Sequence, residues 1–201
     1  MLPSDFADLK RYPNVMRFVN KQLNMQFDDL RAMMKLPRRS QGLPAGCNFA
    51  AALTLCNLIA GIAAILFRSD KGASGKGRGF VALMVKYYPW APGETKKAKE
   101  EIAETLYELV RNPLAHSLGV LQTPRQQKAE VVIKKTPLRE KELQRIEKAV
   151  VRPKSVLPAV FSEGSRRTVS VVGLYWGFIQ MYRTLCRDNR QMEAAERRLA
   201  S

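Results

Sequence analysis

The sequence predicts an all-α protein, an up-and-down bundle of four to five long helices with a small mixed insertion before the last helix. Long runs with apolar residues at three- and four-residue steps alternate with short breaks rich in Gly and Pro, which is the pattern of helical bundles. The 201 residues fit one domain, and a content of 46% hydrophobic and 26% charged residues is typical of globular chains. We therefore predict a single domain over 1–201, with short connections that make neighbouring helices antiparallel.

Residues 13–36 are expected to form the first long amphipathic helix. Their apolar side chains recur at three- and four-residue steps, with Arg and Lys between them. Pro37 and the polar stretch that follows it, up to Gly42, end this helix.

Residues 46–67 contain no charged residue and predict an unusually apolar helix. Its length is enough to span a bilayer, and basic residues flank both of its ends. Asn48, Asn57 and many small residues fit instead the centre of a bundle, where amides find hydrogen-bond partners and helices approach closely. We favour a core helix and no membrane contact. The alternative is a transmembrane segment, which would make this a membrane-anchored basic protein.

Residues 69–79 form a Gly-rich basic stretch that we interpret as a flexible linker. A phosphate-binding loop of the Walker type needs four residues between two glycines, and it lies between a strand and a helix. Here only two residues separate Gly72 from Gly75, and the preceding segment is helical in pattern. Three basic side chains of the stretch are still candidates for contacts with a nucleic-acid backbone: Lys71, Lys76 and Arg78.

Two helices are expected next, a short one at about 80–88 and a longer one from about Glu94 to Arg111. The segment from Pro89 to Gly93 separates them. Acidic residues gather in the N-terminal half of the longer helix, where they complement the helix dipole. Tyr107 lies one turn before Arg111, where it either orders the arginine, stacks on a base or belongs to the core.

The insertion is expected at about 118–158, where the helical period is lost. Residues 130–134 are β-branched and favour a strand, and 138–150 favour a charged helix. This region either lines an RNA groove or is a solvated excursion, and its candidate nucleic-acid contacts are Arg125, Lys128, Lys134 and Lys135. The last helix is expected to start near Ser165 and to run almost to the end, with a highly charged portion at 187–201.

The charge of the chain is strongly positive, with 34 Lys and Arg against 18 Asp and Glu and a net charge of +16. Such an excess favours polyanionic partners, namely nucleic acid or an anionic membrane surface. The three cysteines form no CxxC pair, and with one histidine they supply no zinc ligand set of the usual kind, so we expect neither a metal nor another cofactor. Reduced thiols and the absence of an apolar leader segment lead us to expect a cytoplasmic protein.

The single histidine of the chain lies in the hexapeptide Arg111-Asn112-Pro113-Leu114-Ala115-His116. Histidine is the side chain that titrates near neutral pH without perturbation, and arginine is a permanent cation suited to a phosphate oxygen. On a straight helix, positions five apart diverge by roughly 140° around the axis. Because Pro113 disfavours the α conformation at Asn112, we expect a break there and a new turn that carries His116. We expect both side chains at one exposed cleft.

These residues resemble the HEPN superfamily, whose hallmark is Arg, four to six residues and then His, commonly with a polar residue directly after the Arg. Arg111, Asn112 and His116 match this pattern at the four-residue spacing. The resemblance implies a helical bundle that forms a homodimer, in which two Arg/His pairs make one composite, metal-independent ribonuclease site. It also implies action as a toxin or antiviral nuclease, with an antitoxin or another inhibitor protein as a possible further partner.

The function expected from the motif and the charge is metal-independent cleavage of RNA by attack of a 2′-hydroxyl on the adjacent phosphate. His116 would act as general base or acid, and Arg111 would hold the phosphate and stabilise its developing charge. Asn112 would bind the phosphate or orient the imidazole, although helix capping explains it equally well. The structural alternative makes Arg111 a C-terminal helix charge and His116 a partly buried spacer, in a bundle that binds RNA without cleaving it.

Overall fold

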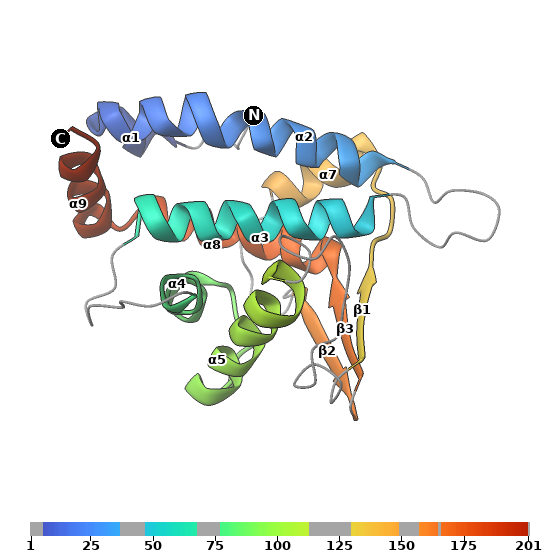
Figure 1. The fold of residues 1–201 in the computed structure, drawn as a ribbon. Coiled ribbons are helices and arrows are strands. Elements are labelled where there is room, and N and C mark those ends of the chain that lie inside the picture. Colours follow the sequence, from blue (N-terminus) through green and yellow to red (C-terminus); the bar gives the residue numbers. More distant parts are fainter. Residues whose placement is uncertain are drawn as a thin grey trace.

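The computed structural model describes residues 6–36, 47–67, 77–112, 130–148, 157–164 and 166–200. These residues form a predominantly helical fold with one small mixed sheet (Figure 1). The helical elements are η1 (Phe6–Arg11), α1 (Pro13–Phe18), η2 (Val19–Leu23), α2 (Asn24–Lys35), α3 (Asn48–Ile65), α4 (Arg78–Tyr87), α5 (Lys96–Thr105), η3 (Leu106–Arg111), α7 (Glu140–Lys148), α8 (Val171–Cys186) and α9 (Asn189–Ala200). The strands are β1 (Glu130–Lys134), β2 (Val160–Glu163) and β3 (Arg166–Ser170).

The first long helix is confirmed, and it is built from α1, a π-helical turn at η2, and α2. Pro13 occupies the start of α1, where its missing N–H and fixed φ suit a helix. The amino end of α1 is closed by α9: the Glu196 carboxylate accepts hydrogen bonds from the backbone N–H of Asn14 and, at 3.0 Å, of Val15. The two ends of the described chain therefore lie together (Figure 1).

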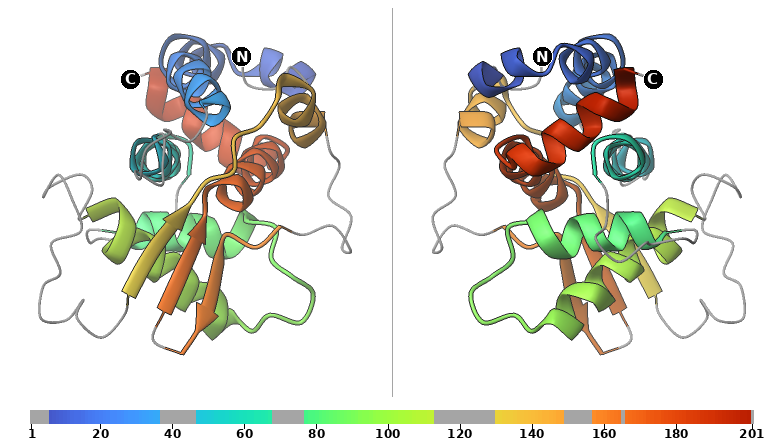
Figure 2. Two further views of the ribbon diagram at one scale, coloured as in Figure 1. Left: turned by 90° about the vertical axis from the view of Figure 1, so that its right-hand side faces the viewer. Right: turned by 90° about the vertical axis from the view of Figure 1, so that its left-hand side faces the viewer.

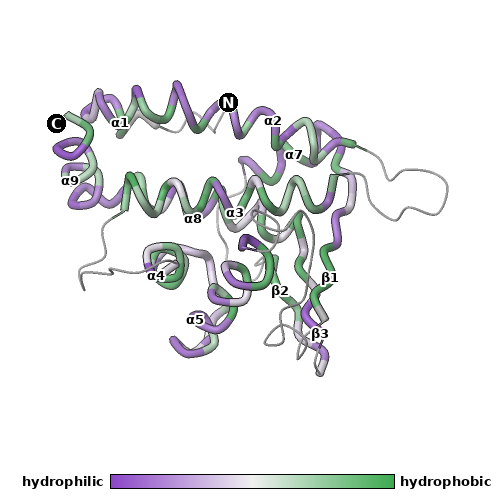
Figure 3. Tube along the Cα trace, viewed as in Figure 1, coloured by the Kyte–Doolittle hydropathy of each residue, from purple (hydrophilic) through white to green (hydrophobic). Residues whose placement is uncertain are grey.

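Helix α3 is the centre of the core. It packs against α2, α4, α8, η3 and β1, and in Figure 3 its tube is largely green and pale, with few purple stretches. Among the described residues it is the one helix long and apolar enough to cross a membrane, and half of that window is buried inside the protein. The buried Asn48 donates its side-chain amide to the carbonyl of Ile133 at 3.1 Å. These contacts support the interpretation of residues 46–67 as a core helix.

The sheet has the strand order β1-β3-β2, with β1 parallel and β2 antiparallel to β3. Side chains alternate between its two faces, so Ile133 and Val169 point to the core whereas Thr168 points away from it. Helices α4 and α5 lie over one face of the sheet, as the two views of Figure 2 show, and Arg167 of β3 forms an ion pair with Glu101 of α5 at 3.4 Å. The strand predicted at 130–134 is confirmed as β1, and the helix predicted at 138–150 is confirmed over α7, while residues 149–150 lie outside the described residues.

The prediction for the last helix is wrong in two places. Residues 166–170 form β3 rather than the start of a helix, because they pair with both β1 and β2. The helix that follows begins at Val171, where the hydroxyl of Ser170 accepts a hydrogen bond from the N–H of Gly173 at 3.1 Å. It ends at Cys186, and α9 starts anew after Asp188, whose carboxylate accepts a hydrogen bond from the N–H of Gln191.

The up-and-down arrangement is the part of the predicted fold that the structure does not confirm. Helices α2, α3 and α8 run across Figure 1 in similar directions, and α3 contacts both α2 and α8. Helix α4 is seen nearly end-on in the same view, and α5 crosses the sheet obliquely. The helices therefore pack around α3 in more than one direction, and the sheet joins their core through the buried side chains of Ile133 and Val169.

Candidate active site

The helix that carries Arg111 begins at Lys96, directly after its cap Thr95, and becomes π-helical before it reaches the motif. The hydroxyl of Thr95 accepts a hydrogen bond from the N–H of Ala98 at 3.2 Å, which caps α5. From Leu106 to Arg111 the helix is π-helical, and the N–H of Asn112 reaches back to the carbonyl of Tyr107. Single π turns inserted in α-helices are frequent at functional sites, although this chain has another at η2.

Asn112 has helical backbone angles, with φ at −66° and ψ at −49°. The predicted break at this residue is therefore wrong. The steric effect of Pro113 on the preceding residue is a bias that helical context can override. The wider π turn changes the rotational position of Arg111 relative to an ideal α-helix.

The guanidinium of Arg111 is held by its own helix. Its Nη1 donates to the side-chain oxygen of Asn112 at 3.1 Å, and its central carbon lies 5.6 Å from the centre of the Tyr107 ring, in a cation–π arrangement. Arg111 and Asn112 are both half-buried rather than exposed, which corrects the expectation of an open cleft for the arginine. Such local contacts fix the orientation of a planar cation, as a phosphate-binding group requires.

The charge of Arg111 also acts on the buried thiol of Cys56 in α3. Burial raises the pKa of Cys56 to about 12, and the nearby guanidinium opposes this rise. The thiol is consequently protonated at neutral pH and is not a nucleophile. Among the described residues, no group of three His, Cys, Asp or Glu side chains is placed to hold a metal ion.

The end of the Gly-rich stretch meets the motif helix at Tyr107. A methyl group on Gly77 would lie 2.5 Å from a carbon of the Tyr107 ring, and the backbone φ of Gly77 is +89°. Phe80 packs on the other part of the same ring, with 5.4 Å between the ring centres. Arg78 follows Gly77 directly and is exposed at the start of α4. The structure therefore brings one predicted nucleic-acid contact, Arg78, to the neighbourhood of the motif.

The remaining predicted site residues fall in three groups. Lys134 is exposed at the end of β1. Lys135 is 3% exposed, and its ammonium donates to the carbonyls of Met33 and Leu36 at the end of α2. The prediction that Lys135 contacts nucleic acid is therefore wrong, since this ammonium caps a helix. The other predicted residues lie outside the described ranges: Lys71, Lys76, His116, Arg125 and Lys128.

Comparison with models of protein families, with curated proteins and with solved structures finds no match to this chain. The case for a function consequently depends on the residues and contacts described above.

Gly77→Ala is expected to lower the free energy of unfolding by at least about 2 kcal/mol, since strained φ values cost roughly 1–3 kcal/mol and the new methyl group also displaces the Tyr107 ring. Gly93→Ala is the matched control, because Gly93 has a φ of +86° and open space where the methyl group would be. Urea denaturation of the two variants measures the difference. Equal losses would show that the Tyr107 contact contributes nothing.

Proposed function

We propose that this protein is a metal-independent endoribonuclease of the HEPN kind. The observation that carries the proposal is the guanidinium of Arg111, which Asn112 and Tyr107 orient at the last described residues before the segment that contains His116. The net charge of +16 supports the choice of a polyanionic substrate. The proposal includes the helical bundle of that superfamily as the frame of the site.

In the proposed reaction, a ribose 2′-oxygen attacks the adjacent phosphorus and the bond from phosphorus to the 5′-oxygen breaks. One imidazole takes the proton of the 2′-hydroxyl, and a second imidazole gives a proton to the departing 5′-oxygen. The products are a 2′,3′-cyclic phosphate and a 5′-hydroxyl end. Arg111 stabilises the negative charge that builds on the phosphate oxygens.

Two copies of the motif are needed for this chemistry, because one histidine per chain does not readily act as base and acid at once. We therefore propose a homodimer in which two Arg111/His116 pairs face one groove, as the family resemblance implies. Two subunits of charge +16 repel each other, so the contact between them must be apolar and the basic faces must point to solvent or RNA.

The proposal is tested by incubating the purified protein with single-stranded RNA in the presence of a chelator. The expected result is cleavage that persists without divalent ions and leaves cyclic-phosphate and 5′-hydroxyl ends. Sedimentation at micromolar concentration is expected to show a dimer. Cleavage that stops on chelation would contradict the metal-independent mechanism, and a strict monomer with or without RNA would remove the composite site.

A non-catalytic RNA-binding protein is the second candidate. The half-buried position of Arg111 favours it, because contacts with Asn112 and Tyr107 give this arginine a structural role without any substrate. Binding of RNA without cleavage under all of the conditions above would establish this alternative.

A further inference from the structure

The sheet has one face that no described helix covers, which we name the outer face. Figure 2 shows α4 and α5 behind the sheet in one view and in front of it in the other, so both helices lie on the opposite side. The alternation of side chains places Lys134 of β1, Arg166, Thr168 and Ser170 of β3, and Phe161 and Glu163 of β2 on the outer face. The residues between them, such as Ile133 and Val169, are buried in the core.

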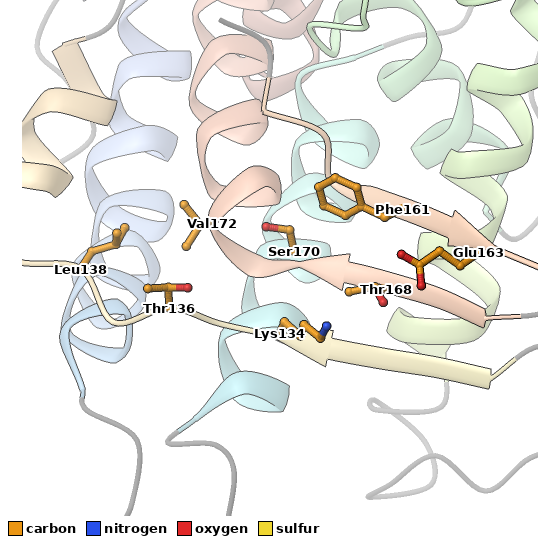
Figure 4. A pocket seen from close by; sticks show the side chains of 8 residues that line it. All are labelled: Lys134, Thr136, Leu138, Phe161, Glu163, Thr168, Ser170 and Val172. Carbon is orange, nitrogen blue, oxygen red and sulfur yellow. The ribbon is translucent and has the colours of Figure 1, made fainter.

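The outer face contains a hollow of about 450 Å³ (Figure 4). This volume lies within the usual range for small-molecule sites. The β3 residues form the floor, and the two edge strands supply the charged groups on either side of it. The hollow is lined by Lys134, Thr136, Leu138, Phe161, Glu163, Thr168, Ser170 and Val172.

Phe161 presents an aromatic ring to this hollow and is 46% exposed. It lies opposite Thr168 in the sheet register, one row from the pair formed by Lys134 and Ser170. The two edge strands are two strand spacings apart, roughly 10 Å. Across the outer face, the apolar ring of Phe161 is therefore followed by the hydroxyl groups of Thr168 and Ser170 and then by the ammonium of Lys134. Glu163 lies beyond the ring, on the side away from the ammonium.

This order of groups matches the order of groups in a nucleotide. A base stacks on an aromatic ring, and its amino groups donate to a carboxylate. A phosphate is attracted by the ammonium of Lys134. At the other end of the hollow Glu163 lies opposite Arg166, so these two residues add no net positive charge there and the phosphate is favoured at Lys134. The hydroxyl of Ser170 accepts a hydrogen bond from Gly173, and a hydroxyl that accepts can donate to a sugar or phosphate oxygen as well.

We propose that the outer face binds one unpaired nucleotide of an RNA strand, with its base on Phe161 and its phosphate toward Lys134. The net charge of +16 favours a strand over a free nucleotide, because each further phosphate adds to the attraction. The inference rests on the proposed function in taking the strand to be the RNA substrate. It adds a second contact with unpaired RNA, besides the contact proposed for the Arg111 motif.

The test uses a short single-stranded deoxyoligonucleotide that contains 2-aminopurine, whose fluorescence falls on stacking. This probe has no 2′-hydroxyl and cannot be cleaved by the proposed mechanism, so binding is measured apart from catalysis. Phe161→Ala is expected to weaken binding about tenfold and to abolish the quenching, as loss of one base–aromatic stack does. Phe161→Trp is expected to retain both. Lys134→Gln is expected to reduce the slope of log affinity against log salt by about 0.7, the value for one phosphate.

Two variants are matched controls. Phe49 at the start of α3 is 50% exposed, so Phe49→Ala removes an equally exposed ring elsewhere. Lys97→Gln removes an exposed charge from α5. Equal binding by the Phe161→Ala and Phe49→Ala proteins would overturn the proposal, and so would equal affinity for the probe and a mononucleotide. Failure to cleave RNA would contradict the proposed function alone, because this binding test does not depend on cleavage.

Discussion

His116→Ala is expected to lower the rate of RNA cleavage about 10²- to 10⁴-fold, the usual contribution of general acid–base catalysis. With one histidine in each chain, no other imidazole is present to replace it. The rate is measured under single-turnover conditions, so that product release does not mask the chemical step. Undiminished cleavage by the purified variant would show that this motif is not the catalyst.

Arg111→Ala is expected to lower the same rate about 10²-fold or more, as removal of a group that stabilises transition-state charge does. Arg111→Lys is expected to recover little, because an ammonium keeps the charge but lacks the planar fork that binds two oxygens. Since Arg111 is half-buried against Tyr107, its loss is also expected to cost about 1 kcal/mol of stability, more than a surface change.

Arg145→Ala is the control for Arg111→Ala, because Arg145 is exposed on α7 and the change in net charge is the same. It is expected to cleave RNA at close to the normal rate. If Arg111→Ala unfolds the protein while Arg145→Ala does not, the structural interpretation of Arg111 is favoured. Equal losses of activity would instead assign the effect to net charge.

The second large effect is expected for Glu147, whose side chain joins three helices. Its carboxylate accepts a hydrogen bond from the hydroxyl of Tyr175 at 2.6 Å and forms an ion pair with Nε of Arg31 at 2.7 Å. The Glu147 side chain is only 11% exposed, so Glu147→Ala leaves a partly buried guanidinium without this partner. Removal of one member of a buried pair costs about 3–5 kcal/mol, a large share of the usual 5–15 kcal/mol of a domain.

Glu140→Gln is the matched control, since Glu140 pairs with the same Arg31 at 2.6 Å but is 44% exposed. The hydrogen bond from Lys35 lowers the pKa of Glu140 to about 2, yet solvent screens this pair and a small effect on stability is expected. Glu147→Gln should fall between the two variants, because the amide oxygen still accepts from Tyr175. The prediction fails if urea denaturation shows equal losses for Glu147→Ala and Glu140→Gln.

Periodicity predicted the helices and the strand that are defined by local pattern. Residues 48–65 have no charge and pack on several sides, and 130–134 are β-branched, so both were found. Strand β3 was missed because two of the five residues in its sequence, RRTVS, are charged, and it becomes a strand by pairing with β1 more than thirty residues earlier. The end of α8 could have been found, because Asp188 and Asn189 are good capping residues.

The sequence pattern named candidate site residues but did not predict the environment of Arg111. The sequence pattern singled out Arg111 and Asn112, and their side chains do contact each other. It did not reveal that Tyr107 and Gly77 meet beside them, because that contact joins segments thirty residues apart. The sequence also does not distinguish the two adjacent lysines. Because side chains alternate along a strand, Lys134 points to solvent, whereas Lys135 is buried and its ammonium binds a carbonyl at the end of α2.

The hydrogen bonds between the Glu196 carboxylate and the start of α1 have a consequence for folding during synthesis. The amino end of α1 emerges from the ribosome before the carboxylate that satisfies its N–H groups, which is translated more than 180 residues later. Contacts of such long sequence separation form late and slow the approach to the native state. Until Glu196 has been translated, the helix that begins at Pro13 therefore lacks this cap, and its apolar stripe is accessible to chaperones.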